Sequence, residues 1–202
     1  PNFTTVGAAP NPENYSAFDL ARELAVKENA DVIFATDPDC DRVGVMAKNA
    51  KGQFETISGN CMGCLLLDYI LSAYSENGTM PPDPYAVKTI VSTDLAEEIC
   101  RCFGVKLYEV LTGFKYIGEV IKRHEDSGKG SFILGFEESY GYLKGTYARD
   151  KDAVVASMLI TEMAAYYKEK DMTLIDARTA MYEKYGYFAE KTENFQIAGL
   201  DA

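Results

Sequence analysis

The alternation of short apolar runs with amphipathic stretches in the second half of the chain constrains the fold most. Three apolar runs have the length of buried strands, at 87–91, 106–111 and 131–135. Stretches with apolar residues at helical spacing follow them, at 95–103, 116–123, 151–168 and 174–185. Asp94 and Glu97 resemble a capping box at the start of the first of these stretches. Strands that alternate with helices in this way predict a mostly parallel sheet with helices packed on it.

The first third of the chain shows a smaller pattern of the same class. Apolar spacing predicts helices over 17–25 and 61–74, and a buried strand over 31–35. Two further strands, 43–47 and 54–57, flank an Asn-Ala-Lys-Gly turn and predict a hairpin. The expected fold class is therefore α/β, with two α/β units that each contain a mostly parallel mixed sheet and packed helices.

Three of the seven prolines lie close together between the two patterns, at Pro81, Pro82 and Pro84. Proline fixes φ and removes a backbone donor, so neither helix nor strand is expected to run through this segment. We place a domain boundary there. The expected divisions are a first unit, a second unit and the start of a linker, at 1–78, 79–188 and 189–202.

Charge and apolar content exclude several classes of function. The net charge is −11, and no basic cluster stands out that could overcome this field and attract nucleic acid. No apolar run approaches the ~20 residues of a membrane-spanning helix. The count of five cysteines is odd, which argues against a secreted disulfide framework. We expect a cytoplasmic protein with neither a nucleic-acid partner nor a membrane partner.

The cysteines and the single histidine offer little chemistry. Cys61 and Cys64 have the spacing of half a zinc ribbon, and Cys100 and Cys102 could supply the other half. Both pairs fall in apolar segments with helical spacing, where cysteine acts as a small hydrophobic residue. His124 lies among charged residues at the polar end of a predicted helix, and we expect a solvated surface side chain.

An acidic loop directly follows the predicted strand 31–35. Asp37, Asp39 and Asp41 alternate along it. Carboxylates that converge repel one another unless a cation neutralises them, and hard oxygen ligands favour magnesium, calcium or manganese. Ligands bind outside the carboxyl ends of strands in parallel α/β sheets. The sequence therefore predicts a cation site here, with a solvated acidic turn as the plainer alternative.

Two other classes of acidic loop also begin with alternating acidic residues. A calcium-binding EF-hand needs glycine and glutamate at its sixth and twelfth positions, where this chain has Arg42 and Lys48. The loop of haloacid-dehalogenase-like phosphatases also has two alternating aspartates after a strand. In such a phosphatase Asp37 would be the nucleophile. The phosphatase loop usually continues with Thr or Val, however, where this chain has Asp41 and Arg42. That phosphatase and a non-catalytic acidic metal-binding module stay as alternatives.

A second acidic loop follows the predicted strand 131–135. Glu137 and Ser139 offer short oxygen acceptors and a hydroxyl, which suit the hydroxyl groups of a sugar. Paired carboxylates could also indicate a glycosidase. Glu137 and Glu138 are adjacent, however, and adjacent side chains of an extended segment point to opposite sides. That geometry weakens the glycosidase interpretation.

Four segments together resemble the α-D-phosphohexomutases, the phosphoglucomutase and phosphomannomutase family. The resemblance spans nearly the whole chain. Asp37–Arg42 resembles the metal-binding loop of the family, and Gly135–Ser139 resembles its sugar-recognition loop. Thr112–Lys115 is similar to a substrate-contacting loop of domain three, and Arg149–Asp152 to a segment with a lysine near the reacting phosphate. Cys40 departs from the small residue of many members and is expected to point away from the metal.

The resemblance implies roles for nine residues. A magnesium ion would be held by Asp37, Asp39 and Asp41. The hexose phosphate would be bound by Thr112, Gly113, Glu137 and Ser139. Catalytic roles fall to Lys151 and Arg42. Lys151 would stabilise phosphoryl charge or relay a proton, Arg42 would contact phosphate or pair with the aspartates, and the role of Lys115 stays open.

The resemblance also implies a reaction and a missing part. Family members interconvert hexose 1-phosphate and hexose 6-phosphate, with glucose or mannose as the sugar, through a phosphoserine and a bisphosphate intermediate. The serine loop of domain one, which is followed by histidine, has no counterpart here, and neither has domain four. We expect a fragment that comprises the later part of domain two, domain three and the start of a linker. Such a fragment is expected to be inactive without domains one and four of the same protein.

Overall fold

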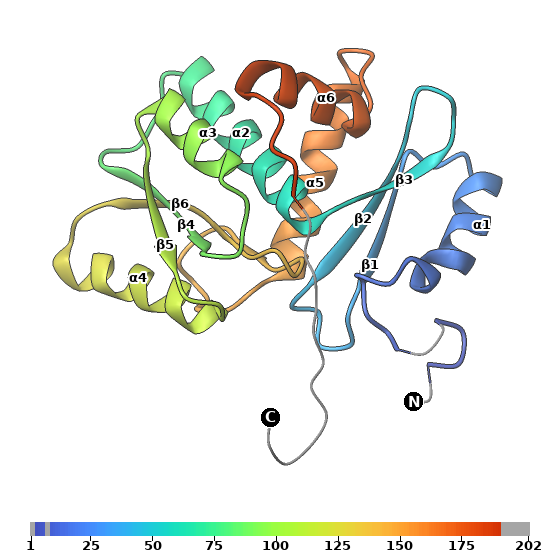
Figure 1. The fold of residues 1–202 in the computed structure, drawn as a ribbon, viewed down its shortest axis with the longest axis horizontal. Helices are drawn as coiled ribbons and strands as arrows, with labels where there is room; N and C mark the ends of the chain where they lie inside the picture. Colours follow the sequence, from blue (N-terminus) through green and yellow to red (C-terminus); the bar gives the residue numbers. More distant parts are fainter. Residues whose placement is uncertain (1–2, 7–8, 191–202) are drawn as a thin grey trace.

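The strands of this computed structural model, which describes residues 3–6 and 9–190, form two sheets (Figure 1). The first sheet has the order β1-β2-β3, with strands β1 (Val32–Thr36), β2 (Val43–Lys48) and β3 (Phe54–Ile57). The second sheet has the order β5-β4-β6-β7, with strands β4 (Pro84–Thr89), β5 (Lys106–Val110), β6 (Ser131–Phe136) and β7 (Tyr142–Leu143). The predicted α/β class with two sheets is confirmed.

The first sheet is antiparallel in both of its pairs, so the expectation of a mostly parallel sheet was wrong for the first unit. β2 pairs with β1 on one side and with β3 on the other. Short loops join these strands, and a parallel pair would need a crossover of a dozen or more residues. The turn between β2 and β3 is the predicted Asn-Ala-Lys-Gly sequence, in which Gly52 has φ +77° and Asn49 Oδ1 accepts from two backbone amides. The predicted hairpin is confirmed.

The second sheet is mixed and mostly parallel. β4 pairs in parallel with β5 and β6, and β7 returns antiparallel to β6. Helices α3 (Leu95–Phe103) and α4 (Phe114–Ser127) lie between the parallel strands in the sequence. Alternate residues of β4 face different cores, because Ala86 packs with α3 whereas Tyr85 and Val87 pack with α4. The two helices therefore cover opposite faces of the sheet (Figure 1).

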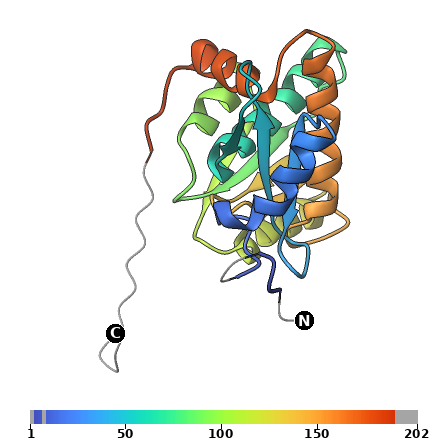
Figure 2. The same ribbon diagram turned by 90° about the vertical axis from the view of Figure 1, so that its right-hand side faces the viewer.

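Opposite faces of the first sheet are covered in the same way. The short 3-10 helix η1 (Tyr15–Phe18) and α1 (Asp19–Lys27) pack on one face, where Ile33 joins their apolar cluster. The other face belongs to the main core, which includes residues of α5 (Ala153–Lys168) and α6 (Leu174–Tyr185). Figure 1 shows this sheet between α1 and α5, and Figure 2 views the same arrangement from the side of α1. In the part of the chain that the structure describes, no helix has the length and apolar content that crossing a bilayer requires.

Helix α2 (Gly59–Glu76) is the centre of the main core. Most of its side chains are buried, and it packs against α3, α5, α6 and β6. Residues of β2 and β3 belong to the same apolar cluster, so both sheets share one core. The domain boundary near 78 stays a prediction, and α2, which precedes it, packs mainly on elements that follow it. Most of the predicted linker, residues 191–202, lies outside the described residues.

Several local expectations were wrong. The predicted strand 87–91 runs instead from Pro84 to Thr89, so a strand begins within the proline segment, as proline can occupy the first position of a strand. Ile90 and Val91 are exposed in the turn that follows. Asp94 makes no side-chain cap on α3, because its carboxylate lies 3.5 Å from the buried Lys88 Nζ. His124 is half-buried rather than solvated: its ring stacks on Tyr85. Both ring nitrogens of His124 also form hydrogen bonds, with Lys129 O and with the Tyr108 hydroxyl. These contacts hold the ring against the protein although its neighbours in the sequence are charged.

Gly63 on α2 generates the first prediction. A Cβ at this position would lie 2.3 Å from the ring of Phe136, the last residue of β6. We expect Gly63→Ala to lower the free energy of unfolding by about 1–2 kcal/mol, after the better helix propensity of alanine is subtracted. Urea unfolding would measure the change. Ser75→Ala, on the exposed side of the same helix, should change it by less than about 0.5 kcal/mol. A more stable Gly63→Ala protein would contradict this packing.

Candidate functional site

The first acidic loop joins β1 to β2 and gathers its three aspartates. A backbone hydrogen bond from Cys40 N to Asp37 O closes a turn, and Cys40 has φ +59°. The side chain of Cys40 packs against the main core, as expected for a residue that points away from the carboxylates. Asp37, Asp39 and Asp41 each place a carboxylate oxygen so that all three lie within 4.8 Å of one another. This set of hard oxygen donors fits magnesium, calcium or manganese.

Asp37 is the anchor of this loop. Its side chain is buried, Oδ1 accepts from the backbone N–H of Asp41 and of Arg42 at 3.1 Å, and Oδ2 accepts from Arg42 Nε at 2.8 Å. Burial raises the pKa of Asp37, but the hydrogen bonds from Arg42 and Asp41 outweigh it and lower the pKa to about 2. Asp37 is therefore a carboxylate throughout the physiological pH range.

Arg42 ties the first loop to the segment before α1. Its guanidinium donates to Asp37 Oδ2 and, through Nη1, to Glu13 Oε1 at 2.9 Å. Asp41 lies farther from it, with 3.8 Å between Arg42 Nε and Asp41 Oδ1. Of the two roles that the sequence left open for Arg42, the structure contains the pairing with aspartates. Contact with a phosphate stays a prediction.

Lys151 lies between the two acidic loops. Its Nζ is 2.9 Å from Asp41 Oδ2, 3.0 Å from Asp150 Oδ1 and 4.0 Å from Glu137 Oε1. Burial lowers the pKa of Lys151, but the hydrogen bonds with Asp41 and Asp150 raise it above its ordinary value. Lys151 is thus a cation that faces both loops. It precedes the N-cap of α5, Asp152, instead of lying in the first turn of the helix.

The second acidic loop follows β6 and turns its two glutamates apart. Glu137 is buried and faces Lys151, and burial raises the pKa of its carboxyl group. Glu138 faces the other way, where its Oε2 accepts from Thr89 Oγ1 at 2.9 Å. The expectation that these neighbours point to opposite sides is confirmed. Ser139 Oγ donates to Glu138 Oε1 at 2.9 Å.

Backbone contacts hold the two acidic loops together. Arg42 and Gly141 form an antiparallel bridge, and Val43 N donates to Tyr140 O at 3.1 Å. Gly141 is needed for this approach, because a Cβ there would lie 2.2 Å from Cδ of Lys151 and 2.9 Å from Glu137 Oε1. The structure therefore brings Asp37, Asp39, Asp41, Arg42, Glu137 and Lys151 to one place.

Thr112 and Gly113 lie at the start of α4. Gly113 has φ +117°, and Thr112 is exposed. The next residue, Phe114, has its ring centre 5.5 Å from Lys151 Nζ, which places this segment beside the lysine. In the described ranges neither residue hydrogen-bonds to the second loop. Their contact with a substrate stays a prediction, and Lys115, whose Nζ lies 4.9 Å from the ring centre of Tyr116, keeps an open role.

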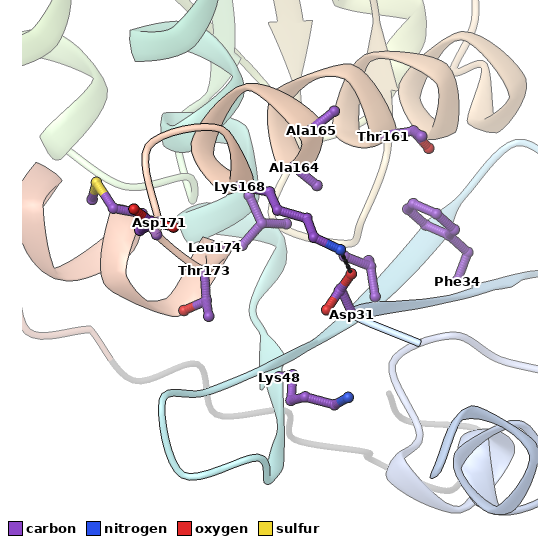
Figure 3. Close-up of a pocket in the computed structure, with 12 residues that line it drawn as sticks. Asp31, Phe34, Lys48, Thr161, Ala164, Ala165, Lys168, Asp171, Thr173 and Leu174 are labelled. Carbon is purple, nitrogen blue, oxygen red and sulfur yellow. Dashed lines mark hydrogen bonds and ion pairs between the residues drawn. The ribbon is translucent and has the colours of Figure 1, made fainter. Parts of the chain in front are cut away.

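A cavity of about 570 Å³ lies elsewhere, between β1 and the helices α5 and α6 (Figure 3). Val32, Phe34 and Ala164 contribute to its apolar lining, and an ion pair joins Lys168 Nζ to Asp31 Oδ2 at 2.6 Å. None of the predicted site residues lines it. The candidate site is thus the junction of the two acidic loops and not this cavity.

The comparison with family models decides the family. Residues 58–185 match the α/β/α domain III of phosphoglucomutase/phosphomannomutase, and residues 1–52 match domain II of the same family. The chain belongs to the phosphoglucomutase/phosphomannomutase family. The resemblance that the acidic loops suggested is therefore confirmed.

Individual family members agree with this assignment. The chain is 38% identical over 201 residues to the phosphoglucomutase of Staphylococcus aureus strain N315. The aligned region covers 100% of this chain and 35% of that protein. The chain thus spans about a third of the length of the curated relatives it matches. Two crystal structures share the fold at a TM-score of 0.66: a putative phosphomannomutase of Thermus thermophilus and the phosphoglucomutase parafusin of Paramecium. They are 22% and 20% identical and cover 88% and 90% of this chain, and 36% and 30% of their own chains.

Two features of this candidate site were missed by reasoning from sequence. The ion pair of Arg42 with Glu13 spans 29 residues, and the hydrogen bond of Thr89 with Glu138 spans 49. Nothing in the local pattern around Thr89 marks it as a partner of the second loop. The pair of acidic loops was visible because each follows a predicted strand directly.

The acidic cluster generates the second prediction. We expect Mn²⁺, used as a paramagnetic probe, to bind the chain weakly and to broaden the NMR signals of the first loop. Asp39→Asn should weaken this binding about tenfold or more, because a carboxylate ligand loses its charge. Asp83→Asn, at an exposed position directly before β4, is the matched control and should leave the affinity unchanged. Equal broadening in both variants would show that the first loop is not the cation site.

Proposed function

We propose that this chain is the part of a phosphohexomutase that holds the magnesium site and recognises the sugar. The parent protein would interconvert hexose 1-phosphate and hexose 6-phosphate, of glucose or mannose, through a phosphoserine and a bisphosphate intermediate. The observation that carries the proposal is Lys151, which faces Asp41 of the first loop and Glu137 of the second. The named relative in Staphylococcus aureus, a phosphoglucomutase, supports the reaction class.

Asp37, Asp39 and Asp41 would hold the magnesium ion. Their oxygens converge within 4.8 Å, and a carboxylate set of this kind suits a hard dication. Magnesium bound there would neutralise charge on a phosphoryl group during transfer. One protein of similar fold, an N-acetylphosphoglucosamine mutase of Aspergillus fumigatus, has been solved in complex with GlcNAc-6P and magnesium. It is 16% identical with a TM-score of 0.53, so it supports the fold of the site and not its ligands.

Glu137 and Ser139 would bind hydroxyl groups of the hexose, and Thr112 and Gly113 would contact it from the start of α4. Oxygen acceptors on a short loop match the donors of sugar hydroxyls. Burial of Glu137 beside Lys151 makes it a fixed acceptor. The sugar would then lie at the junction of the two acidic loops.

Lys151 and Arg42 would handle the charge of the reacting phosphate. Lys151 is a cation at the junction, positioned to stabilise phosphoryl oxygens or to relay a proton to the departing hydroxyl. Arg42 holds Asp37 in place with Nε, and its second interaction with Glu13 lies on the surface. The donor serine and further phosphate-binding groups would come from other domains of the parent protein, which we propose is cytoplasmic.

The geometry argues against the phosphatase alternative. A nucleophilic Asp37 would need an electron-rich carboxylate to attack phosphorus. Instead Oδ1 accepts two backbone N–H groups, Oδ2 accepts from the Arg42 guanidinium, and these hydrogen bonds lower the pKa of Asp37 to about 2, which makes it a weak nucleophile. A non-catalytic acidic module would not need Lys151 aligned between the loops. Both alternatives therefore explain less of the site.

The third prediction concerns turnover. The 202-residue chain, given glucose 1-phosphate, magnesium and glucose 1,6-bisphosphate, should show no turnover, whereas the full-length protein should form glucose 6-phosphate. Lys151→Met in the full-length protein should lower kcat by about 10²- to 10⁴-fold, the usual contribution of a general acid or base. A coupled dehydrogenase assay would measure the product.

Lys168→Met is the matched control for Lys151→Met, because Lys168 pairs with the distant Asp31 on the surface. It should leave kcat unchanged. Turnover by the 202-residue chain would contradict the expectation of an inactive part. Release of inorganic phosphate by that chain, lost on Asp37→Asn, would favour the phosphatase. A full-length protein without mutase activity would favour the non-catalytic module.

A further inference from the structure

Three buried polar residues lie where the central strand β4 ends. Lys88 is 0% exposed, Thr89 is 0% exposed and Ser92 is 5% exposed. Lys88 Nζ donates to Ser92 O at 3.1 Å and forms an ion pair with Glu109 of β5. Ser92 N donates to Thr89 O at 3.0 Å, which closes the turn. A buried cation thus fixes this turn, and with it the position of the Ser92 hydroxyl.

The hydrogen bonds from the hydroxyls of this turn to the second acidic loop all run in the same donor-to-acceptor direction. Thr89 Oγ1 donates to Glu138 Oε2 at 2.9 Å, because a carboxylate only accepts. Since the single proton of Thr89 is used there, the 2.8 Å contact between Ser92 Oγ and Thr89 Oγ1 has Ser92 as donor. On the other side of the same carboxylate, Ser139 Oγ donates to Glu138 Oε1 at 2.9 Å. All three hydroxyl protons therefore have defined positions.

The backbone of Glu138 is also fixed. Gly59, the first residue of α2, approaches it so closely that a Cβ there would lie 2.1 Å from Glu138 O. The carboxylate is held by Thr89 and the carbonyl by the start of α2. The Glu138 carboxylate therefore cannot rotate away from Ser139 without breaking its hydrogen bond with Thr89, while the start of α2 limits movement of the backbone.

We propose that Thr89, Ser92 and Glu138 are positioning residues that make Ser139 an acceptor-only contact for the sugar. The Ser139 proton is committed to Glu138, so its hydroxyl can only accept from a ligand. Glu137 is the second acceptor, on the face of the loop toward Lys151. The loop then selects ligands that donate two hydrogen bonds, such as the hydroxyls of a hexose phosphate. This inference rests on the proposed function, and it adds which partner donates each hydrogen bond: the sugar donates and the protein accepts.

Deoxyfluoro sugars test the polarity, because fluorine replaces a hydroxyl in size but cannot donate. The full-length protein would be assayed with glucose 1-phosphate and with its 2-, 3- and 4-deoxyfluoro analogues. At the ring position that faces Ser139, fluorine should lower kcat/KM about tenfold or more beyond its electronic effect, as expected for a lost hydrogen bond.

Glu138→Gln reverses the polarity and supplies the decisive comparison. The glutamine oxygen would accept from Thr89, and its amide would donate to Ser139 Oγ, whose proton is then free for the ligand. The fluorine penalty should fall about tenfold at that one ring position. Electronic effects of fluorine cancel, since the same analogue is compared in both proteins. A merely structural role would lower kcat/KM equally for all analogues and leave the penalties unchanged, which would overturn the proposal.

Thr89 variants test the positioning step. Thr89→Val removes the hydroxyl, and it should reduce the fluorine penalty at the same position, whereas Thr89→Ser should restore it. Thr179→Val is the matched control, because the Thr179 hydroxyl donates to Ile175 O within α6. It should change no penalty. A Thr89→Ser protein that behaves like Thr89→Val would contradict the role of the hydroxyl.

A measurement without ligand separates this proposal from the proposed function. In amide NMR spectra of the 202-residue chain, Thr89→Val should shift the signals of residues 138–140, and Thr179→Val should not. Absence of those shifts would overturn the positioning role. If the full-length protein has no activity on glucose 1-phosphate, the proposed function fails and the sugar preference fails with it. The NMR result then still decides whether Thr89 positions the loop.

Discussion

The candidate site depends on one ion-pair arrangement, in which the Lys151 ammonium lies between carboxylates of two loops. Asp41 and Glu137 lie in loops that follow strands of different sheets. Both are acidic residues near Lys151, in a chain of net charge −11. Without a cation between them, burial and mutual repulsion would oppose this junction. The bridge between Arg42 and Gly141 brings the backbones together, and Lys151 compensates the charge that this approach concentrates.

The fold places these loops by sharing one core between two sheets. β1 and β6 both end beside the junction, and α2 packs under β6 while its cluster extends to β2 and β3. The close contact of Gly63 with Phe136 and of Gly59 with Glu138 puts α2 directly behind the second loop. Packing of one helix therefore sets where the second acidic loop lies relative to the three aspartates of the first loop. The whole of this helix lies within the part of the chain that matches the domain III model.

Local features of this site could be predicted from the sequence, and long-range ones could not. The convergence of Asp37, Asp39 and Asp41 could be predicted from their spacing by two residues. The opposite directions of Glu137 and Glu138 could be predicted because they are adjacent. Both predictions depend only on backbone geometry over a few residues. The Asp94 cap failed since a buried cation 3.5 Å away attracts that carboxylate. Thr89 lies 49 residues from Glu138, and only the parallel pairing of β4 with β6 makes them neighbours.

The charge balance of the first loop explains why a cation would still be needed. Arg42 neutralises Asp37 and Lys151 neutralises Asp41, whereas in the described part of the chain Asp39 has no ion-pair partner. The cluster is therefore left with about one unit of negative charge, which is a modest attraction for a dication in water. A cation bound by all three carboxylates would also compete with Lys151 for Asp41. Tight binding would then need a further anionic ligand, and under the proposed function that ligand would be a phosphoryl group.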